Sequence, residues 1–247
     1  MTSFSGDGRL AGRIALVTGA SRGIGAAVAK RFAAEGAHLV LVARTQGGLE
    51  EVDDAIRKAA GIKHDEDGAT LVPLDITDYD EIDRMGAALY ERFGRLDVLV
   101  GNAGILGELS PLGHIEPADW DAVMATNLTA NWRLVRSLDP LLQASEAGRA
   151  VFVSSGVARK VFPYWGGYAV SKAALEMLVK IYAAENEQTN VNANILDPAT
   201  VRTGMRAKAM PGEDPMSLPE PDAITEDFVK LAEASCTMNG EIVRVSS

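Results

Sequence analysis

A doubly wound α/β fold accounts best for this sequence, with parallel strands in one sheet and helices on both of its faces. Short apolar runs rich in Val, Ile and Leu alternate along the chain with longer segments of helical period. The runs are apolar on both faces, as strands are when helices cover both sides of a parallel sheet. A glycine-rich segment, TGASRGIG at residues 18–25, follows the first run and opens the first helical segment. Together these observations predict a single sheet of about seven parallel strands.

In the first half of the chain the alternation is regular. The strand RIALVTG (13–19) precedes a helix at about 23–35, and HLVLVA (38–43) precedes a helix at about 47–60. The strand ATLVPLD (69–75) is followed by a helix at about 78–93, and LDVLVGN (96–102) by one at about 117–145. This half contains the glycine-rich turn, so residues 10–105 are predicted to form the nucleotide-binding half.

The second half, residues 106–247, continues the pattern with one interruption. The strand RAVFVSS (149–155) precedes a helix at about 168–187, and NVNANIL (190–196) precedes one at about 222–236. The last strand is EIVRVSS (241–247). Residues 210–221, MPGEDPMSLPEP, are too rich in proline for a helix or a strand and are predicted to form a loop.

Length and composition favour one domain over residues 1–247. A chain of 247 residues with 47% hydrophobic content can bury roughly 70–75% of its unfolded surface. The formal net charge of −10 argues against a nucleic-acid partner. No apolar run approaches a membrane span, and MTSFSGDGRL lacks the features of a secretory signal, so a cytoplasmic protein is expected. Cys236 is the only cysteine, and His38, His64 and His114 are scattered, so no metal site is expected.

Polar residues gather where the predicted strands end. Gly19, Gly23 and Gly25 permit a tight turn and let a phosphate approach the backbone N–H groups at a helix start. A tight turn with no ligand is the alternative for the glycines alone. Ligands of open α/β sheets lie beyond the carboxyl ends of the strands. The unusual polar residues lie at these ends: Thr18, Arg44, Asp75, Asn102, Ser154, Ser155 and Asp197.

The segment YWGGYAVSKAAL (164–175) contains a second candidate for chemistry. A tyrosine that exchanges protons near neutral pH needs a fixed positive neighbour, because a phenol normally titrates near 10. Tyr168 and Lys172 have the i, i+4 spacing that places two side chains on one helix face. Tyr164 lies eight residues before Lys172, with Gly166 and Gly167 between them. An incidental Tyr and Lys on one helix face remain the alternative for the pair alone.

The motifs, taken in order, resemble the short-chain dehydrogenase/reductase family of NAD(P)-dependent oxidoreductases over nearly the whole chain. They are TGASRGIG (18–25), LDITD (74–78), NAG (102–104), Asn127 in ATNLTANW, SS (154–155), YAVSK (168–172) and DPATVRT (197–203). The stretches WGGYAVSK and MRAKAMPGEDP are similar to those of a bacterial subgroup. The resemblance implies a Rossmann-type fold and interconversion of a carbonyl and an alcohol.

The resemblance also implies the roles of individual residues. In the family the catalytic serine stands thirteen residues before the tyrosine, which selects Ser155 and Tyr168. Tyr168 is then the acid or base, and Lys172 together with the positive charge of the oxidised nicotinamide lowers its pKa. Lys172 also holds the nicotinamide ribose, and Ser155 binds the substrate oxygen. Asn127 anchors a water chain that relays the proton. The implied cofactor-binding residues are Gly19, Ser21, Arg22, Gly23, Ile24, Gly25, Arg44, Thr45, Asp75, Ile76, Asn102, Ala103, Gly104, Tyr168, Lys172, Pro198, Val201 and Thr203.

The cofactor is expected to be NADP rather than NAD. A site that prefers NAD usually offers an acidic residue about 20 residues beyond the glycines, where this chain has Ala43, Arg44 and Thr45. Arg44 and Arg22 are placed to pair with a 2′-phosphate. Solvated surface charge is the alternative for either arginine alone.

The second half departs from the family pattern at Pro198–Ala199, where Pro-Gly is usual, so an alanine must tolerate a conformation that suits glycine. Residues 203–221 are predicted to form a lid over an apolar pocket. Its candidates are Leu106, Phe162, Tyr164, Trp165, Met205 and Met210, with ordinary core packing as the alternative.

Three further expectations concern partners and activity. The substrate is a small carbonyl compound or alcohol. The helices at 117–145 and 168–187 are expected to pair in a homodimer, with ordinary core packing as the alternative for the two helices. A homotetramer is less favoured than a homodimer because the chain ends soon after its last strand. A non-catalytic NADP(H)-binding regulatory protein of the same fold is the rival function.

Overall fold

The computed structural model describes residues 8–60 and 68–245. In these ranges the chain forms a seven-stranded sheet in the order β3-β2-β1-β4-β5-β6-β7. All neighbouring strands are parallel, which confirms the predicted doubly wound α/β fold. The strands are β1 (Ile14–Thr18), β2 (His38–Ala43), β3 (Thr70–Pro73), β4 (Val98–Gly101), β5 (Gly148–Val153), β6 (Val191–Asp197) and β7 (Ile242–Arg244).

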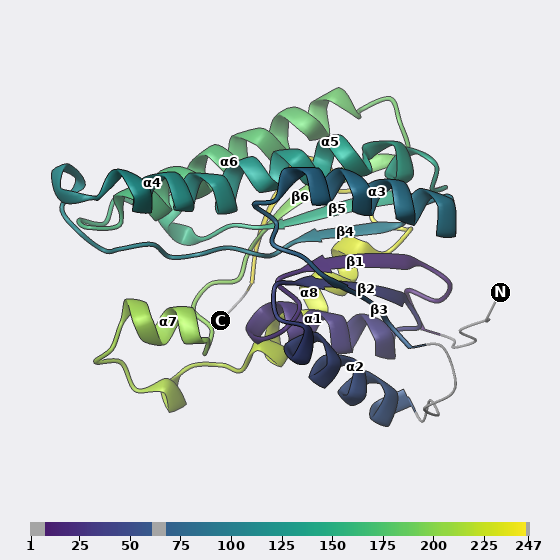
Figure 1. The fold of residues 1–247 in the computed structure, drawn as a ribbon, viewed down its shortest axis with the longest axis horizontal. Helices are drawn as coiled ribbons and strands as arrows, with labels where there is room; N and C mark the ends of the chain where they lie inside the picture. Colours follow the sequence, from purple (N-terminus) through teal and green to yellow (C-terminus); the bar gives the residue numbers. More distant parts are fainter. Residues whose placement is uncertain (1–7, 61–67, 246–247) are drawn as a thin grey trace.

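Helices cover both faces of this sheet, and Figure 1 shows the two layers on either side of the strands. One layer holds α1 (Gly23–Ala34), α2 (Gln46–Ala60) and α8 (Thr225–Ala232), which pack apolar side chains such as Phe32 and Phe228 against the sheet. The other layer holds α3 (Tyr79–Phe93), α5 (Ala130–Gln143) and α6 (Gly166–Glu185), where Leu134 and Leu175 are fully buried. The strands lie between two separate apolar cores, which explains why their sequences are apolar on both faces.

The predicted helix at 117–145 contains an interruption. It consists of α4 (Pro117–Met124), a π-helical turn (Ala125–Thr129) and α5, so one wider turn separates two α-helical segments. Such turns occur frequently at functional sites, and this one contains Asn127. No helix in the two described ranges is long and apolar enough to cross a bilayer.

The region predicted to be a lid loop has more regular structure than expected. A short helix, α7 (Gly204–Ala209), begins after Thr203, whose hydroxyl accepts the Arg206 N–H at 3.1 Å. A 3₁₀ turn (Pro215–Ser217) lies within the predicted proline-rich loop. A second 3₁₀ turn (Pro221–Ile224) precedes α8, which ends at Ala232 instead of the predicted residue 236. The last strand is also shorter than predicted, and residues 246–247 lie outside the described ranges.

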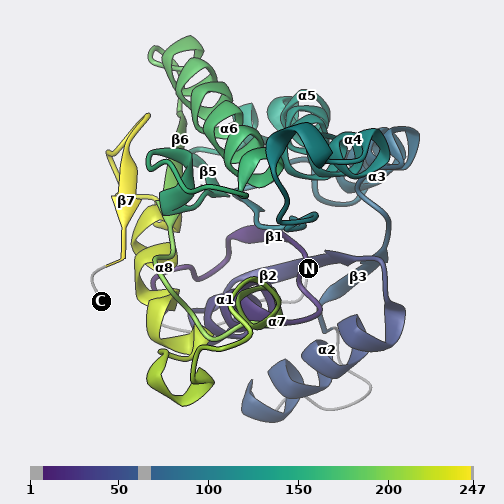
Figure 2. The ribbon, with the colours of Figure 1, turned by 90° about the vertical axis from the view of Figure 1, so that its left-hand side faces the viewer.

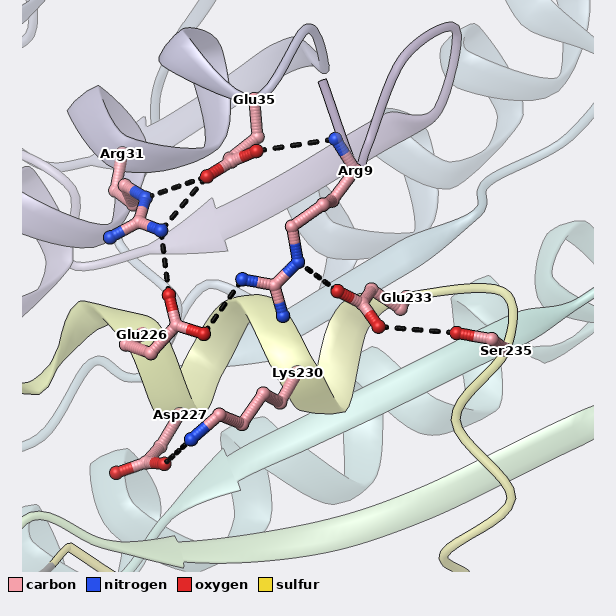
Figure 3. A network of polar contacts seen from close by, with 8 residues as sticks. All are labelled: Arg9, Arg31, Glu35, Glu226, Asp227, Lys230, Glu233 and Ser235. Carbon is pink, nitrogen blue, oxygen red and sulfur yellow. Dashed lines mark hydrogen bonds and ion pairs between the residues drawn. The ribbon is translucent and has the colours of Figure 1, made fainter. Parts of the chain in front are cut away.

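An ion-pair network fastens the beginning of the described chain to α1 and α8 (Figure 3). Arg9 pairs with Glu226 at 2.7 Å and with Glu233, and its backbone N–H donates to Glu35 at 3.2 Å. Arg31 pairs with both Glu35 and Glu226. These contacts hold α8, the last helix, beside α1, the helix that follows the glycine-rich turn.

Candidate active site

The glycine-rich turn between β1 and α1 has the shape that an anion site requires. Gly19 and Gly23 have φ angles of 64° and 56°, in the left-handed region that favours glycine. A Cβ at Gly19 would lie 2.9 Å from Asn102 Nδ2 and 3.0 Å from the Cα of Ala103. Arg22, the N-cap residue of α1, has extended backbone and its side chain makes no capping bond. The N–H groups of the first turn are therefore available to a phosphate.

Next to this turn, polar contacts join the ends of β1 and β4. The Thr18 hydroxyl donates to the Val100 carbonyl and accepts the Asn102 and Ala103 N–H groups at 3.0 and 3.1 Å. The Asn102 amide donates to the Thr18 carbonyl at 2.9 Å. Because β1 pairs with β2 on one side and β4 on the other, this is the point where strand order reverses. Ligands of open α/β sheets bind at such points.

Ser155, Tyr168 and Lys172 meet beyond the ends of β5 and β4. Ser155 follows β5, and its hydroxyl is hydrogen-bonded to that of Tyr168 on α6. Lys172 lies one turn further along α6, with its Nζ 5.8 Å from the centre of the Tyr168 ring. Lys172 Nζ also donates to the Val153 carbonyl at 2.7 Å. The neighbouring Ser154 is buried, and its hydroxyl donates to Glu176 at 2.6 Å. The choice of Ser155 over Ser154 stays a prediction.

Burial governs the acidity of this group. It raises the pKa of Tyr168 to about 12, an effect that the hydrogen bond from Ser155 opposes and the charge of Asp197 reinforces. Burial also lowers the pKa of Lys172 to about 8. In the polypeptide alone, burial therefore dominates the pKa of Tyr168, because removal from water disfavours the charged phenolate. The lowering implied for Lys172 together with the oxidised nicotinamide stays a prediction.

Asn127 is fully buried in the π-helical turn and braces a neighbouring loop. Its Oδ1 accepts the Ile105 N–H at 2.8 Å, and its Nδ2 donates to the Ile105 carbonyl at 2.9 Å and to Ser171 Oγ at 3.0 Å. Its backbone carbonyl accepts a bond from Asn131. Gly104 lies between Asn127 and Lys172: a Cβ there would be 3.2 Å from Asn127 Oδ1 and 3.5 Å from Lys172 Nζ. The water relay expected of Asn127 stays a prediction.

Arg44 and Asp75 face each other across the ends of β2 and β3. The guanidinium lies 3.9 Å from the carboxylate, and the two side chains are 68% and 46% exposed. Burial acts to raise the pKa of Asp75, but hydrogen bonds from the Thr77 N–H and hydroxyl, together with Arg44, lower it. Arg44 is therefore only loosely paired and remains accessible to a ligand.

A single cleft of about 1730 Å³ brings the predicted site residues together. Every predicted catalytic and cofactor-binding residue lines it except Gly25 and Asn127. Gly25 packs behind the turn, where a Cβ would collide with the Gly19 carbonyl. Figure 2 views the molecule from the side where α7 lies, and there α7 is drawn in front of α1. Met205 and Arg206 of α7 line the cleft as well.

The apolar pocket residues divide into two groups. Leu106, Phe162, Trp165 and Met205 line the cleft, whereas Tyr164 and Met210 do not and are 60% and 42% exposed. The rings of Phe162, Trp165 and Tyr168 follow one another with centroids 6.3 and 6.2 Å apart. The row therefore joins the buried ring of Tyr168 to that of Phe162, which is 48% exposed.

Two residues near the cleft have left-handed backbone. Ala199 has a φ of 55°, as expected for an alanine where the family usually has glycine. Tyr164 has a φ of 75°, which the sequence did not indicate, and its carbonyl accepts the Ser110 N–H at 3.1 Å. Each conformation costs roughly 1–2 kcal/mol for a residue with a Cβ.

Sequence reasoning missed a charged group behind the site. Arg159 pairs with Glu176 and Asp197, and both carboxylates are buried. Asp197 stood out only as a polar residue at a strand end, and nothing in the sequence links it to Arg159. In the described ranges no three His, Cys, Asp or Glu side chains lie close enough to hold a metal ion, and His64 falls outside these ranges.

The glycine turn and the switch point define an α/β protein built to hold a dinucleotide, with Ser155, Tyr168 and Lys172 in the same cleft. The profile described as short chain dehydrogenase matches residues 13–214. The chain therefore belongs to the short-chain dehydrogenase/reductase family of oxidoreductases.

Three similar proteins of this family, all from bacteria, illustrate the likeness. The oxidoreductase YciK of Escherichia coli K12 is 36% identical over 219 residues, which cover 89% of this chain and 85% of YciK. A short-chain dehydrogenase structure from Pseudomonas syringae is 39% identical, with a TM-score of 0.91 and 99% of each chain covered. One from Escherichia coli CFT073, complexed with NADPH, is 34% identical with a TM-score of 0.91, covering 97% of this chain and 99% of that one.

Proposed function

We propose that this protein is an NADP(H)-dependent oxidoreductase that interconverts a carbonyl compound and an alcohol through Ser155, Tyr168 and Lys172. The observation that carries the proposal is the hydrogen-bonded pair of Ser155 and Tyr168 hydroxyls in the same cleft as the glycine-rich turn. A proton donor and a dinucleotide turn in one cleft suit hydride transfer, since the bound cofactor supplies the hydride and the protein handles the proton.

Each residue of the group has a distinct part in reduction. Ser155 donates a hydrogen bond to the carbonyl oxygen and holds it beside Tyr168. Tyr168 donates its proton to that oxygen, and its high pKa keeps the phenol protonated until the oxygen becomes basic. Protonated Lys172 stabilises the negative charge left on the phenol oxygen. Asn127 holds the loop of Gly104 against Lys172, and a water relay from its carbonyl would return the proton.

Selectivity for NADP rests on the arginines that border the adenosine end of the cleft. Arg22 and Arg44 both line the cleft, and the residues directly after β2, Arg44 and Thr45, include no carboxylate to repel a 2′-phosphate. The Escherichia coli CFT073 relative with NADPH has the same fold over nearly its whole length. A cofactor phosphate between two cations is the arrangement that this part of the cleft favours.

The substrate side of the cleft favours an apolar compound. The row of Phe162, Trp165 and Tyr168 offers aromatic surface next to the reacting hydroxyls, with Leu106 and Met205 also in the cleft. A ketone or aldehyde on a ring or an apolar chain can bury its carbon skeleton against these side chains.

The proposal also covers the oligomeric state of the protein and its location in the cell. Val170, Met177 and Ile181 are 44%, 59% and 52% exposed and share one stripe of α6, which suits a homodimer through the helices predicted to pair. A homotetramer is the alternative, and the proposed location is the cytoplasm.

The proposal is tested by following loss of reduced-nicotinamide absorbance with benzaldehyde, cyclohexanone, decalone and pyruvate. Tyr168→Phe should abolish turnover and leave NADPH affinity within about twofold, because it removes one proton and little contact surface. Tyr164→Phe is the matched control and should stay near wild type, since Tyr164 does not line the cleft.

Two results would refute this function. An active Tyr168→Phe variant would remove the assigned acid. Tight NADPH binding with no turnover of any compound would favour the rival function, a regulatory protein that senses the cofactor.

A further inference from the structure

A buried group of charges lies directly behind Ser155 and Tyr168. The Arg159 guanidinium donates through one nitrogen to Glu176 on α6 and through the other to Asp197 at the end of β6. Ser154 Oγ donates to Glu176 at 2.6 Å. Asp197 is 0% exposed and Glu176 6%, whereas the Arg159 side chain is 34% exposed. One half-buried cation therefore forms ion pairs with two buried carboxylates.

Arg159 is the cation that compensates the negative charges of Glu176 and Asp197. A carboxylate removed from water is strongly destabilised unless a cation or hydrogen bonds compensate it. Other charged or titratable groups near Asp197 are Tyr168 of α6 and Arg244 of β7, whose backbone is in register with Asp197. Lys172 of α6 lines the same cleft. Lys172 donates to the Val153 carbonyl, and no ion pair joins Arg244 to Asp197 within the described part of the chain. Arg159 is thus the direct partner of both carboxylates.

The same guanidinium also connects two segments of the site. Arg159 follows a 3₁₀ turn (Gly156–Ala158) that begins directly after Ser155, and the Ala158 N–H donates to the Ser155 carbonyl at 3.0 Å. On the other side, Asp197 Oδ1 accepts the N–H of Ala199 at 3.1 Å. The Arg159–Asp197 pair therefore joins the segment that carries Ser155 to the strand end that carries left-handed Ala199.

We propose that Arg159 is a positioning residue of the active site, which holds Ser155 against Tyr168 and balances the buried charge of Asp197 behind them. This inference rests on the proposed oxidoreductase function. Burial is the largest cause of the raised pKa of Tyr168, and the carboxylate of Asp197 adds to it. Without Arg159 that carboxylate would oppose ionisation of Tyr168 more strongly.

The main test is the pH profile of alcohol oxidation with NADP⁺, using the alcohol of the best-reduced compound in the carbonyl panel. Oxidation requires Tyr168 to accept a proton, so its rate rises as Tyr168 ionises. In the NADP⁺ complex the positive charge of the oxidised nicotinamide favours the phenolate, so this rise falls below the pKa of Tyr168 in the polypeptide alone. Arg159→Met should move this rise upward by about one pH unit, as expected for a lost unit charge in a partly buried site. Arg159→Lys should restore part of the shift.

Two further variants separate charge balance from general damage. Arg159→Met combined with Asp197→Asn should return the profile to within about 0.3 units of wild type, because the unbalanced charge is gone. Arg84→Met removes an arginine that is 63% exposed and pairs with Glu81, and its profile should match wild type. An unshifted profile in Arg159→Met, or a double variant shifted as far as the single one, would overturn the inference.

A stability measurement gives a readout that needs no turnover. In Arg159→Met, the buried carboxylates of Glu176 and Asp197 lose their cation. A buried carboxylate without a cation is costly only while it is charged, so the Tm deficit relative to wild type should be larger at pH 8 than at pH 5. A deficit equal at both pH values would refute the charge balance. Absence of turnover in wild type, with a pH-dependent deficit, would refute the oxidoreductase function and leave the charge balance standing.

Discussion

Replacing Arg44 gives the sharpest test of cofactor preference. The Arg44 side chain is 68% exposed, and its guanidinium lies 3.9 Å from the Asp75 carboxylate. This long, exposed ion pair leaves the guanidinium free to bind a ligand. Arg44→Ala should weaken NADPH and leave NADH nearly unchanged, because only NADPH carries the 2′-phosphate. Arg44→Asp should weaken NADPH further, since a carboxylate then faces the phosphate.

The expected loss of NADPH affinity can be calculated from the exposure of the Arg44 side chain. A hydrogen bond to a charged group contributes about 1.5–3 kcal/mol, and solvent screening at an exposed arginine favours the lower end. We therefore expect Arg44→Ala to raise the Kd of NADPH about tenfold, which corresponds to about 1.4 kcal/mol. Repulsion between the introduced carboxylate and the 2′-phosphate at about 5 Å in water adds on the order of 1 kcal/mol. Arg44→Asp should therefore raise the Kd of NADPH by close to a hundredfold.

The assay is a titration of NADPH and NADH against wild type and variants, followed by kcat/KM for both cofactors where turnover is found. Arg84→Ala serves as the control, because Arg84 is exposed to a similar degree and does not line the cleft. The advantage of NADPH should also shrink as salt is raised. A wild type that binds NADH more tightly, or an Arg44→Asp variant with unchanged preference, would refute the reasoning.

Three further predictions concern pH, the lid and the backbone. Carbonyl reduction should fall as pH rises above about 8, where Lys172 loses its proton, and a rate still flat at pH 9 would contradict this role. Limited proteolysis should cut residues 203–221 more slowly when NADPH and a carbonyl compound are bound, whereas unchanged cleavage would indicate a static surface loop. Ala199→Gly should raise Tm by about 1–3 °C, because relief of the left-handed alanine exceeds the entropic cost of glycine. The control is Ala55→Gly in the exposed face of α2, which should lower Tm instead. An equal loss of Tm in both variants would refute the claim that the backbone at Ala199 is strained.

Most strands were predicted within two residues because each is an unbroken apolar run. β2 has the predicted bounds, 38–43, since His38 and Ala43 delimit four consecutive Leu and Val residues. Helix ends were less predictable: α6 begins at Gly166, two residues before the prediction, and α7 was not expected because its first residue is a glycine. The Thr203 cap was a signal for α7 that the composition of the segment obscured.

The site was predictable where neighbours in sequence are neighbours in space. Tyr168 and Lys172 share a helix face, and Gly19 and Gly23 share one turn. Local spacing could not choose between Ser154 and Ser155, which required the family resemblance. Nor could it indicate that Arg159 pairs with residues 17 and 38 positions away, because such contacts depend on how β5, β6 and α6 pack. The raised pKa of Tyr168 was missed for the same reason, since burial is a property of the packed protein.

The π-helical turn at Ala125–Thr129 sets how α4 and α5 are phased. Successive residues of an α-helix point about 100° apart, so a segment one residue shorter would rotate everything beyond it by about that angle. Deleting one residue from the turn would move Leu134 and Leu138 off the sheet or draw Asn127 away from Ile105, which its side chain now bonds twice. The number of residues between α4 and the buried face of α5 is therefore constrained more tightly than the identity of most side chains in that segment. Deletions there should be tolerated far less than substitutions.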